Sequence, residues 1–332
     1  MYKPNYIKKY NIYDIFYNTL NQIIIIIPIR CSRKVDIYYL NENVNNKFNL
    51  ASCPHGHTYI YSLNTQYTNN IKLMIDNDII ETFINKYPDL NDNILLSTMV
   101  KNEDNYIKQW IEFHKSIGVD KFVIYDNAKG NDNGLSYSSN QSYSDLSSLL
   151  EEYIKNNIVI LIDWPYPKRT EKGSASGQTT QQNHSIYAFK TSKYIGLFDV
   201  DEYINIQKKT NIKTILDDII KYENINLDSV SCLRIKNKFF YNPENKPADQ
   251  YDFLKIYNCS PIIKQCHEKS FVIPKNTNTY SIHAVTSGKP MYDVDPSYLY
   301  FNHYYFLNKK RGKNKTTMID DSISKHTEIF FN

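Results

Sequence analysis

The alternation of hydrophobic and polar residues changes in character near residue 93. Before that point, short β-branched and aromatic runs are separated by Asn, Ser and Pro, which is typical of strands joined by turns. The strands predicted in this first part are 23–29, 35–40, 58–63 and 71–75. A short helix is predicted over 79–87, because Pro88 would end it. Residues 1–92 are therefore predicted to form a small β-rich domain.

From residue 93 onward, continuous apolar runs alternate with segments of helical periodicity. Residues 94–100 are expected to form a strand buried on both faces, followed by an amphipathic helix that ends at Gly118 and by a second buried strand at 121–125. A strand–helix–strand unit of this kind indicates a parallel sheet. The later elements predicted are strands at 158–162, 194–198 and 229–235 and helices at 146–154, 180–190 and 212–222. The pattern predicts an α/β domain over 93–315 and a tail over 316–332.

Polar residues follow each predicted strand of this α/β domain. They are Lys101, Asn102, Glu103, Asp126, Asn127, Asp163, Asp199, Asp201 and Glu202. Ligands of an open α/β sheet bind beyond the carboxyl ends of its strands, so these residues are candidates for a binding site. Carboxylates gathered at one sheet edge repel each other unless a cation lies among them, and hard oxygen ligands suit Mg²⁺ or Mn²⁺. Side chains two apart on a strand point the same way, so Asp199 and Asp201 are predicted to face one ion.

A D-x-D string by itself is weak evidence for a metal site. The chain contains three of them, at 76–78, 199–201 and 293–295, and most such strings are ordinary turns or helix caps. Only the middle string follows a strongly apolar strand within the alternating strands and helices. That context favours metal binding at Asp199 and Asp201.

Composition and charge narrow the class of protein. A net charge of +4 over 332 residues, with one basic cluster at 309–315, lacks the broad basic face of a nucleic-acid binder. The apolar run 23–27 is far shorter than the ~20 residues that span a bilayer, and no targeting signal is evident. A cytoplasmic or otherwise soluble protein is therefore expected. The 30 Tyr accompany abundant Asn, Ile and Lys, a bias of A/T-rich codons rather than a sign of function.

The cysteines predict neither a disulfide framework nor a zinc site. Their number, five, is odd, and no C-x-x-C spacing is repeated. A single bridge between Cys31 and Cys53 remains open, but no essential disulfide is expected. The segment 53–57, which reads CPHGH, has no second half-site and is a weak metal candidate.

Three blocks of the sequence resemble glycosyltransferase family 92 and its close relatives. The first covers 95–127, the second includes Gln178, Asn183 and the string IGLFDVDEY at 195–203, and the third includes 269–274, 282–285 and NHYY at 302–305. Their order and spacing over roughly 94–310 carry the resemblance. It implies a GT-A fold, which is a Rossmann-like, mostly parallel mixed sheet flanked by helices. It also implies a nucleotide-diphosphate sugar donor, usually UDP-linked, and Mn²⁺ or Mg²⁺.

The resemblance implies roles for individual residues. Asp199 and Asp201 would hold the metal and the donor diphosphate, and His303 would be the third protein ligand, since imidazole suits Mn²⁺ better than Mg²⁺. His283 stands behind His303 as an alternative ligand. The residues implied to line the nucleoside pocket or lie near the donor are Lys101, Asn102, Glu103, Asp126, Gln178 and Asn183.

The general base is the part of the family pattern that this chain matches poorly. Inversion requires a carboxylate that deprotonates the acceptor hydroxyl, and the segment 238–253 departs from the family there. Asp252 is the first candidate, followed by Asp249 and Glu244, while Glu202 either acts in catalysis or supports the metal ligands. Two other histidines have structural readings. His114 is expected to pack in the core from an apolar helix face, and His184 to cap or pack.

The predicted function is an Mn²⁺-dependent glycosyltransferase of the hexosyltransferase type. It would move a sugar from a UDP-sugar to a glycan, glycoprotein or other hydroxyl acceptor, with inversion. One rival is a nucleotidyltransferase or sugar-phosphate enzyme on a similar scaffold, which predicts a glycine-rich loop where this chain has Lys101, Asn102 and Glu103. The other rival is a catalytically inactive nucleotide-sugar or carbohydrate-binding protein, which has no need to keep the predicted metal ligands.

Overall fold

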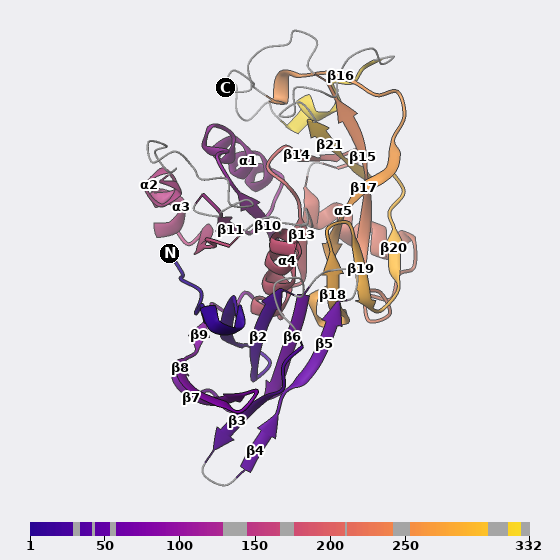
Figure 1. The fold of residues 1–332 in the computed structure, drawn as a ribbon. Coiled ribbons are helices and arrows are strands. Elements are labelled where there is room, and N and C mark those ends of the chain that lie inside the picture. The colour runs from indigo at the N-terminus through magenta and orange to yellow at the C-terminus, as the bar shows by residue number, and fades with distance from the viewer. Residues whose placement is uncertain are drawn as a thin grey trace.

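The computed structural model describes residues 1–28, 34–41, 44–53, 58–128, 145–166, 176–209, 211–241, 253–304 and 318–326. The N-terminal strands form one end of the molecule, and the α/β part with the C-terminal strands forms the other (Figure 1). The N-terminal strands are β1 (Asp14–Asn18), β2 (Gln22–Pro28), β3 (Ile37–Asn41), β4 (Val44–Lys47), β5 (Asn49–Cys53), β6 (Thr58–Asn64), β7 (Asn70–Ile75), β8 (Asp78–Phe83) and β9 (Asn85–Lys86). They form two sheets, in the orders β5-β6-β2-β1-β9 and β4-β3-β7-β8.

Strand β2 is an unbroken run of isoleucines because both of its faces are covered. Successive side chains of a strand point to opposite faces, so a continuous apolar run is stable only where both faces are covered. Ile23, Ile25 and Ile27 pack in the core between the two N-terminal sheets, and Ile24 and Ile26 pack toward the α/β part. All five are fully buried, and each contributes roughly 1.5–3 kcal/mol.

The main sheet is mixed, with strand order β12-β11-β10-β13-β17-β15-β16-β22. Its parallel strands are β10 (Ile94–Val100), β11 (Lys121–Asp126), β12 (Val159–Asp163) and β13 (Tyr194–Leu197). The antiparallel continuation consists of β17 (Lys264–Val272), β15 (Cys232–Phe240), β16 (Asn258–Cys259) and β22 (Met318–Ile319). Strands β20 (Met291–Asp293) and β21 (Leu299–Tyr304) pair with β15, β14 (Glu202–Ile206) pairs with β21, and β18 (Thr277–Ser281) pairs with β19 (Ala284–Gly288). The predicted α/β class is confirmed.

The helices follow the expected signals for their ends. They are α1 (Asp104–Ser116), α2 (Leu146–Leu149), α3 (Glu151–Lys155), α4 (Ser176–Ala188) and α5 (Ile212–Tyr222), with short 3-10 turns at Lys8–Tyr10, Phe253–Lys255, Pro274–Asn276 and Ser322–His326. The chain leaves α1 through Gly118, whose φ of 97° lies in the left-handed region that a glycine tolerates. The Asn211 side chain caps α5 by accepting from the Lys213 N–H at 2.9 Å. None of the helices among the described residues has the length and apolar character of a membrane span.

Helix α4 is polar in sequence and yet almost entirely buried. It lies between the N-terminal sheet and the main sheet (Figure 1), and its polar side chains bond to both. Thr180 pairs with Thr58 of β6 at 3.1 Å, and Gln181 donates to Ser97 of β10 at 3.0 Å. Buried polar groups are usually hydrogen-bonded, so this helix joins the two parts through specific polar contacts, in addition to the apolar packing of Ile186 and Ala188.

The prediction of a helix over 79–87 is wrong, because this segment contains β8 and β9. Asp76 and Asn77 both have positive φ, which is the conformation of a tight hairpin turn between β7 and β8. The intermediate and exposed positions of β8 alternate, which is the period of a strand. The D-x-D string at 76–78 therefore belongs to a hairpin. The predicted helix 146–154 is divided at Leu150 into α2 and α3.

Candidate functional site

The turn between β13 and β14 carries the central acidic residues. Val200 is buried, and the side chains of Asp199 and Asp201 on either side of it are 44% and 20% exposed. Glu202 closes the turn by donating its backbone N–H to the Asp199 carbonyl at 3.1 Å and then begins β14. The two aspartates therefore come from a turn at the carboxyl end of β13, rather than from the strand itself.

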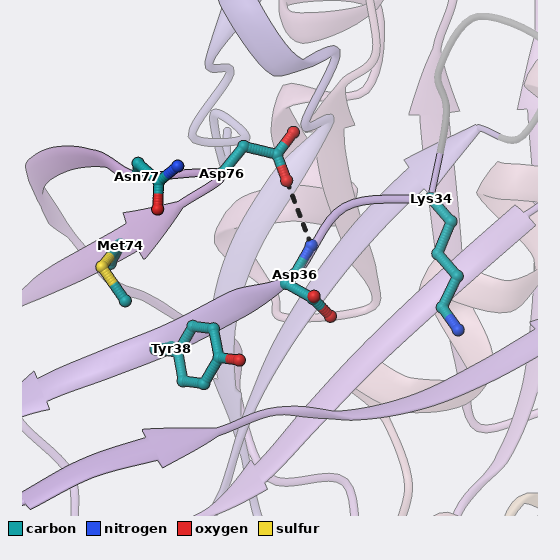
Figure 2. A pocket seen from close by; sticks show the side chains of 6 residues that line it. All are labelled: Lys34, Asp36, Tyr38, Met74, Asp76 and Asn77. Carbon is teal, nitrogen blue, oxygen red and sulfur yellow. Dashed lines mark hydrogen bonds between the residues drawn. The ribbon is translucent and has the colours of Figure 1, made fainter.

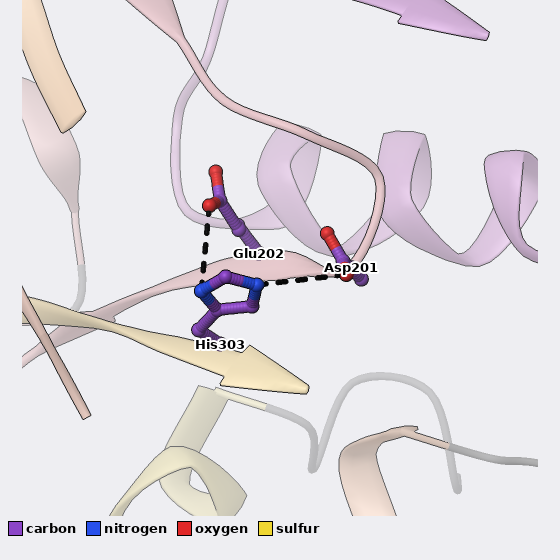
Figure 3. Close-up of side chains that lie close together, drawn as sticks. All are labelled: Asp201, Glu202 and His303. Atoms are coloured by element: carbon purple, nitrogen blue, oxygen red, sulfur yellow. Dashed lines mark ion pairs between the residues drawn. The ribbon is translucent and has the colours of Figure 1, made fainter. Parts of the chain in front are cut away.

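His303 reaches the same place from β21. In the register of β14 and β21, His303 lies opposite Glu202. Its Nε2 is 3.6 Å from Asp201 Oδ2, and its Nδ1 is 3.7 Å from Glu202 Oε1, so the ring stands between the two carboxylates (Figure 3). One ligand atom from each of these three residues lies within 4.8 Å of the others.

Lys269 of β17 completes the cluster, and sequence reasoning missed it as a functional residue. Its side chain is 1% exposed, with Nζ 2.7 Å from Asp199 Oδ2 and 3.1 Å from Glu202 Oε2. Gln178 of α4 holds the other Asp199 oxygen, donating from Nε2 to Oδ1 at 3.2 Å. The available signal was a lysine two residues before the apolar pair Phe271 and Val272 that ends β17, because a lysine in a buried strand needs a carboxylate partner.

Burial and charge shift the protonation equilibria of this cluster. Burial raises the pKa of Glu202 to about 7, although the Lys269 ammonium acts in the opposite direction. Burial by itself lowers the pKa of Lys269, but the carboxylates of Asp199 and Glu202 outweigh it and the pKa is raised. Burial also lowers the pKa of His303, and the Asp201 carboxylate reverses that effect, so this pKa is raised as well.

The grouped residues fit a divalent cation. Asp201, Glu202 and His303 offer two carboxylates and one imidazole, a donor set that suits Mn²⁺ better than Mg²⁺. Glu202 Oε1 is buried, and no described residue lies within hydrogen-bond distance of it. A buried carboxylate oxygen of this kind is stabilised by a cation. The same residues can therefore hold a metal ion without rearranging the strands that carry them.

Helix α1 fixes the position of β14 behind the cluster. Trp110 donates from Nε1 to the Glu202 carbonyl at 3.0 Å, and His114 Nε2 accepts from the Ile204 N–H at 3.2 Å. Burial lowers the pKa of His114 to about 3, so the ring is neutral and able to accept this bond. His114 is fully buried, which agrees with its expected role as a packed core histidine.

The residues predicted for the nucleoside pocket lie along the same edge of the sheet. Lys101, Asn102 and Glu103 follow β10, and Asp126 ends β11 in register with Val100. Asp126 Oδ1 accepts from the Ala128 N–H at 3.0 Å. The Asp199 cluster lies at the end of β13, which is next to β10 in the strand order, and β11 lies on the other side of β10.

Asn183 and two histidines have well-defined surroundings. The Asn183 amide is fully buried and bonds to the backbone of Thr179 and Tyr280, so it ties α4 to β18. His283 is positioned 3.2 Å from the Glu268 carbonyl through Nδ1, and burial together with Lys269 lowers its pKa to about 4. His184 is buried within α4 and takes part in a network described below.

The candidate bases Asp252, Asp249 and Glu244 lie outside the described residues, as do Cys31 and the basic cluster at 309–315.

Two further features prove to be separate from the cluster. The D-x-D string at 293–295 is a structural turn, because Arg234 bonds Asp293 and Asp295 Oδ1 accepts from the Ser297 N–H at 2.7 Å. A pocket of about 510 Å³ (Figure 2) lies on β3 and β7, at the end of the molecule away from β14 and β21 (Figure 1). Its lining is polar and its Asp36 is already paired with Lys47 at 2.7 Å.

These features define an α/β protein with a candidate cation site at the carboxyl edge of its parallel strands. The chain belongs to glycosyltransferase family 92, whose model matches residues 96–329, and the predicted membership is confirmed. A glycosyltransferase family 92 protein of Ricinus communis is 27% identical over 218 residues, which cover 64% of this chain and 35% of that protein.

Two other plant proteins of the same family give shorter matches. One of Oryza sativa subsp. japonica is 24% identical over 124 residues, covering 37% of this chain and 18% of that protein. One of Arabidopsis thaliana is 28% identical over 110 residues, covering 33% of this chain and 16% of that protein. The matches span about a third or less of the length of these relatives.

Proposed function

We propose that this chain is a metal-dependent glycosyltransferase that moves a sugar from a UDP-linked donor to an acceptor hydroxyl, with inversion. The observation that carries the proposal is the meeting of Asp201, Glu202 and His303 at the carboxyl edge of the sheet, in a member of glycosyltransferase family 92. Four parallel strands continued by antiparallel ones support a GT-A arrangement. Ligands of open α/β sheets bind at that edge.

The charges of the cluster favour a divalent ion. Asp199, Asp201 and Glu202 carry three negative charges when ionised, and the Lys269 ammonium carries one positive charge. The difference is two negative charges, which a divalent cation balances. When bound, the ion neutralises the charge that develops on the departing nucleoside diphosphate.

The residues of the cluster differ in exposure, and this difference indicates different roles. Asp199 and Asp201 are the more open carboxylates, so they are the ones able to meet a donor and its cation. Glu202 and Lys269 are each 1% exposed, so they support the site from inside the protein and are not placed to meet an acceptor. We therefore assign the general base to a carboxylate of the segment 244–252, with Asp252 first and Asp249 next. Lys101, Asn102, Glu103 and Asp126 are assigned to the nucleoside pocket, as residues of the same sheet edge.

Calorimetric titration of UDP with and without Mn²⁺ tests this function, using the wild type, Asp201→Asn and Asp295→Asn. Asp295 belongs to a D-x-D string outside the site and is the matched control. UDP binding should depend on Mn²⁺ in the wild type and the control, and should be lost in Asp201→Asn, which removes a charge but keeps the volume. A panel of nucleotide sugars would then identify the donor. Turnover that survives both EDTA and Asp201→Asn would refute the proposal, and metal-independent binding without turnover would indicate an inactive binding protein.

A further inference from the structure

The cluster contains a cation of its own. The Lys269 ammonium lies between Asp199 and Glu202, at 2.7 Å and 3.1 Å, with its side chain 1% exposed. Both contacts are within the range of strong, charge-assisted hydrogen bonds. Removing one member of a buried ion pair leaves the other charge uncompensated, so Lys269 is strongly held in this place.

This contact separates the two aspartates of the D-x-D string. Asp199 is engaged at both oxygens, by Lys269 and by Gln178. Asp201 instead belongs to the compact group with Glu202 and His303. A divalent ion held by Asp201 and His303 would therefore find Asp199 already paired with the ammonium.

The two partners of the Lys269–Asp199 pair differ in their freedom to move. The Asp199 side chain is 44% exposed and lies in a turn, whereas the Lys269 side chain is buried in the middle of the sheet. Asp199 is therefore able to turn its carboxylate toward a neighbouring ion. Lys269 has no comparable path and keeps its second partner, Glu202.

We propose that Lys269 is a resident cation that competes with the divalent metal for Asp199. With a metal ion held by Asp201 and His303, the Asp199 carboxylate would leave the ammonium to join them, and Lys269 would stay paired with Glu202. The competition weakens metal binding to the free protein, and the oxygens of a donor diphosphate restore it, so metal and nucleotide bind together. This inference rests on the proposed function, because it concerns the same metal site.

Lys269→Met tests the competition, because methionine keeps the length of the side chain and removes the charge. Loss of a positive charge that shares a carboxylate with the ion should tighten Mn²⁺ binding by about tenfold, because like charges only a few ångströms apart repel each other even in water. Lys269→Gln, which keeps a hydrogen-bond donor for both carboxylates, should act in the same direction and keeps the test decisive if the methionine variant does not fold. Lys269→Arg keeps the charge and should bind Mn²⁺ like the wild type.

Lys190→Met is the matched control. Lys190 is also a buried lysine, and it donates to the Thr277 carbonyl at 2.8 Å. It lies just past the end of α4, twelve residues after Gln178, so the helix places it about 18 Å from the Gln178 end of α4. Its substitution should leave Mn²⁺ affinity unchanged.

Mn²⁺ titration of the full chain, followed by electron paramagnetic resonance without nucleotide and then with UDP, gives the readout. Tighter metal binding in the two uncharged variants, with a smaller gain on adding UDP, supports the competition. If both uncharged variants bind Mn²⁺ as weakly as the wild type or more weakly, and the wild type does bind it, the competition is overturned and the proposed function is retained. Absence of Mn²⁺ binding by the wild type under either condition would refute both.

Discussion

Asp14 offers the sharpest test of how the N-terminal sheets are joined to the site-bearing domain. It begins β1, it is fully buried, and its carboxylate accepts from the N–H of the adjacent Ile15 at 2.8 Å and from four groups farther away in the sequence. Oδ1 accepts from the Asn5 N–H at 2.7 Å and from Asn85 Nδ2 at 2.8 Å. Oδ2 accepts from the Tyr87 hydroxyl at 2.6 Å and from His184 Nε2 at 3.0 Å. His184 belongs to α4, so this carboxylate bridges the two parts of the molecule.

The substitution Asp14→Ala leaves these donors without an acceptor in a buried place. Each unsatisfied buried group is worth about 1–3 kcal/mol, and breaking a buried charged contact is worth about 3–5 kcal/mol. The contributions overlap, so we expect a loss of about 4 kcal/mol or more in the free energy of unfolding. Asp14→Asn keeps one acceptor oxygen and should lose about 2 kcal/mol, because its amide nitrogen opposes other donors.

Urea unfolding followed by tryptophan fluorescence measures this loss. The two tryptophans, Trp110 and Trp164, are buried and lie outside the N-terminal sheets, whereas the mutated residue lies within them. A shifted tryptophan transition would show that both parts unfold as one cooperative unit. Asp36→Ala is the control, since its pair with Lys47 is exposed and screened by water, so its loss should leave the transition nearly unchanged. A tryptophan transition unchanged in Asp14→Ala would refute the reasoning.

Three further predictions concern the site and its supporting core. His303→Ala should weaken Mn²⁺-dependent UDP binding by roughly one to two powers of ten in calorimetry, and unchanged affinity would remove His303 from the ligand set. Burial lowers the pKa of His114 to about 3, so between pH 6.5 and pH 3 the imidazole is protonated in the unfolded chain but not in the folded protein. Stability should therefore fall by about 2 kcal/mol more in the wild type than in His114→Gln between pH 7 and pH 5, and equal pH slopes in urea unfolding would contradict this. Gly196→Ala should destabilise the protein by about 1–3 kcal/mol in thermal unfolding, because an added Cβ would contact Leu96 and lie 2.9 Å from Phe271, and an unchanged melting temperature would show that β13 has room to move.

The sequence by itself determined the elements whose burial is local. The apolar runs of β10 and β11 predicted parallel strands buried on both faces, and the periodicity of α5 placed that helix at its observed residues. The position of Asp199 directly after such a strand indicated a candidate site at the sheet edge. In each case the hydrophobic pattern of the segment itself indicates its burial, so a short stretch of sequence is sufficient to predict the element.

The residue pattern does not indicate which distant residues meet; the family resemblance implied it for His303, and the tertiary structure decided it. His303 lies opposite Glu202 because β21 pairs with β14 in one register, and a strand pairing across a hundred residues leaves no mark in either segment. Lys269 is similarly brought to Asp199 by β17, although its own surroundings in the sequence resemble an ordinary strand. The pattern predicts a helix at 180–190, close to the observed α4, but it does not predict the burial of that helix, because most of its side chains are polar and their hydrogen-bond partners lie far away in the sequence. The charges that define the site are therefore set by long-range strand register, which follows from the packing of the whole sheet rather than from any local pattern.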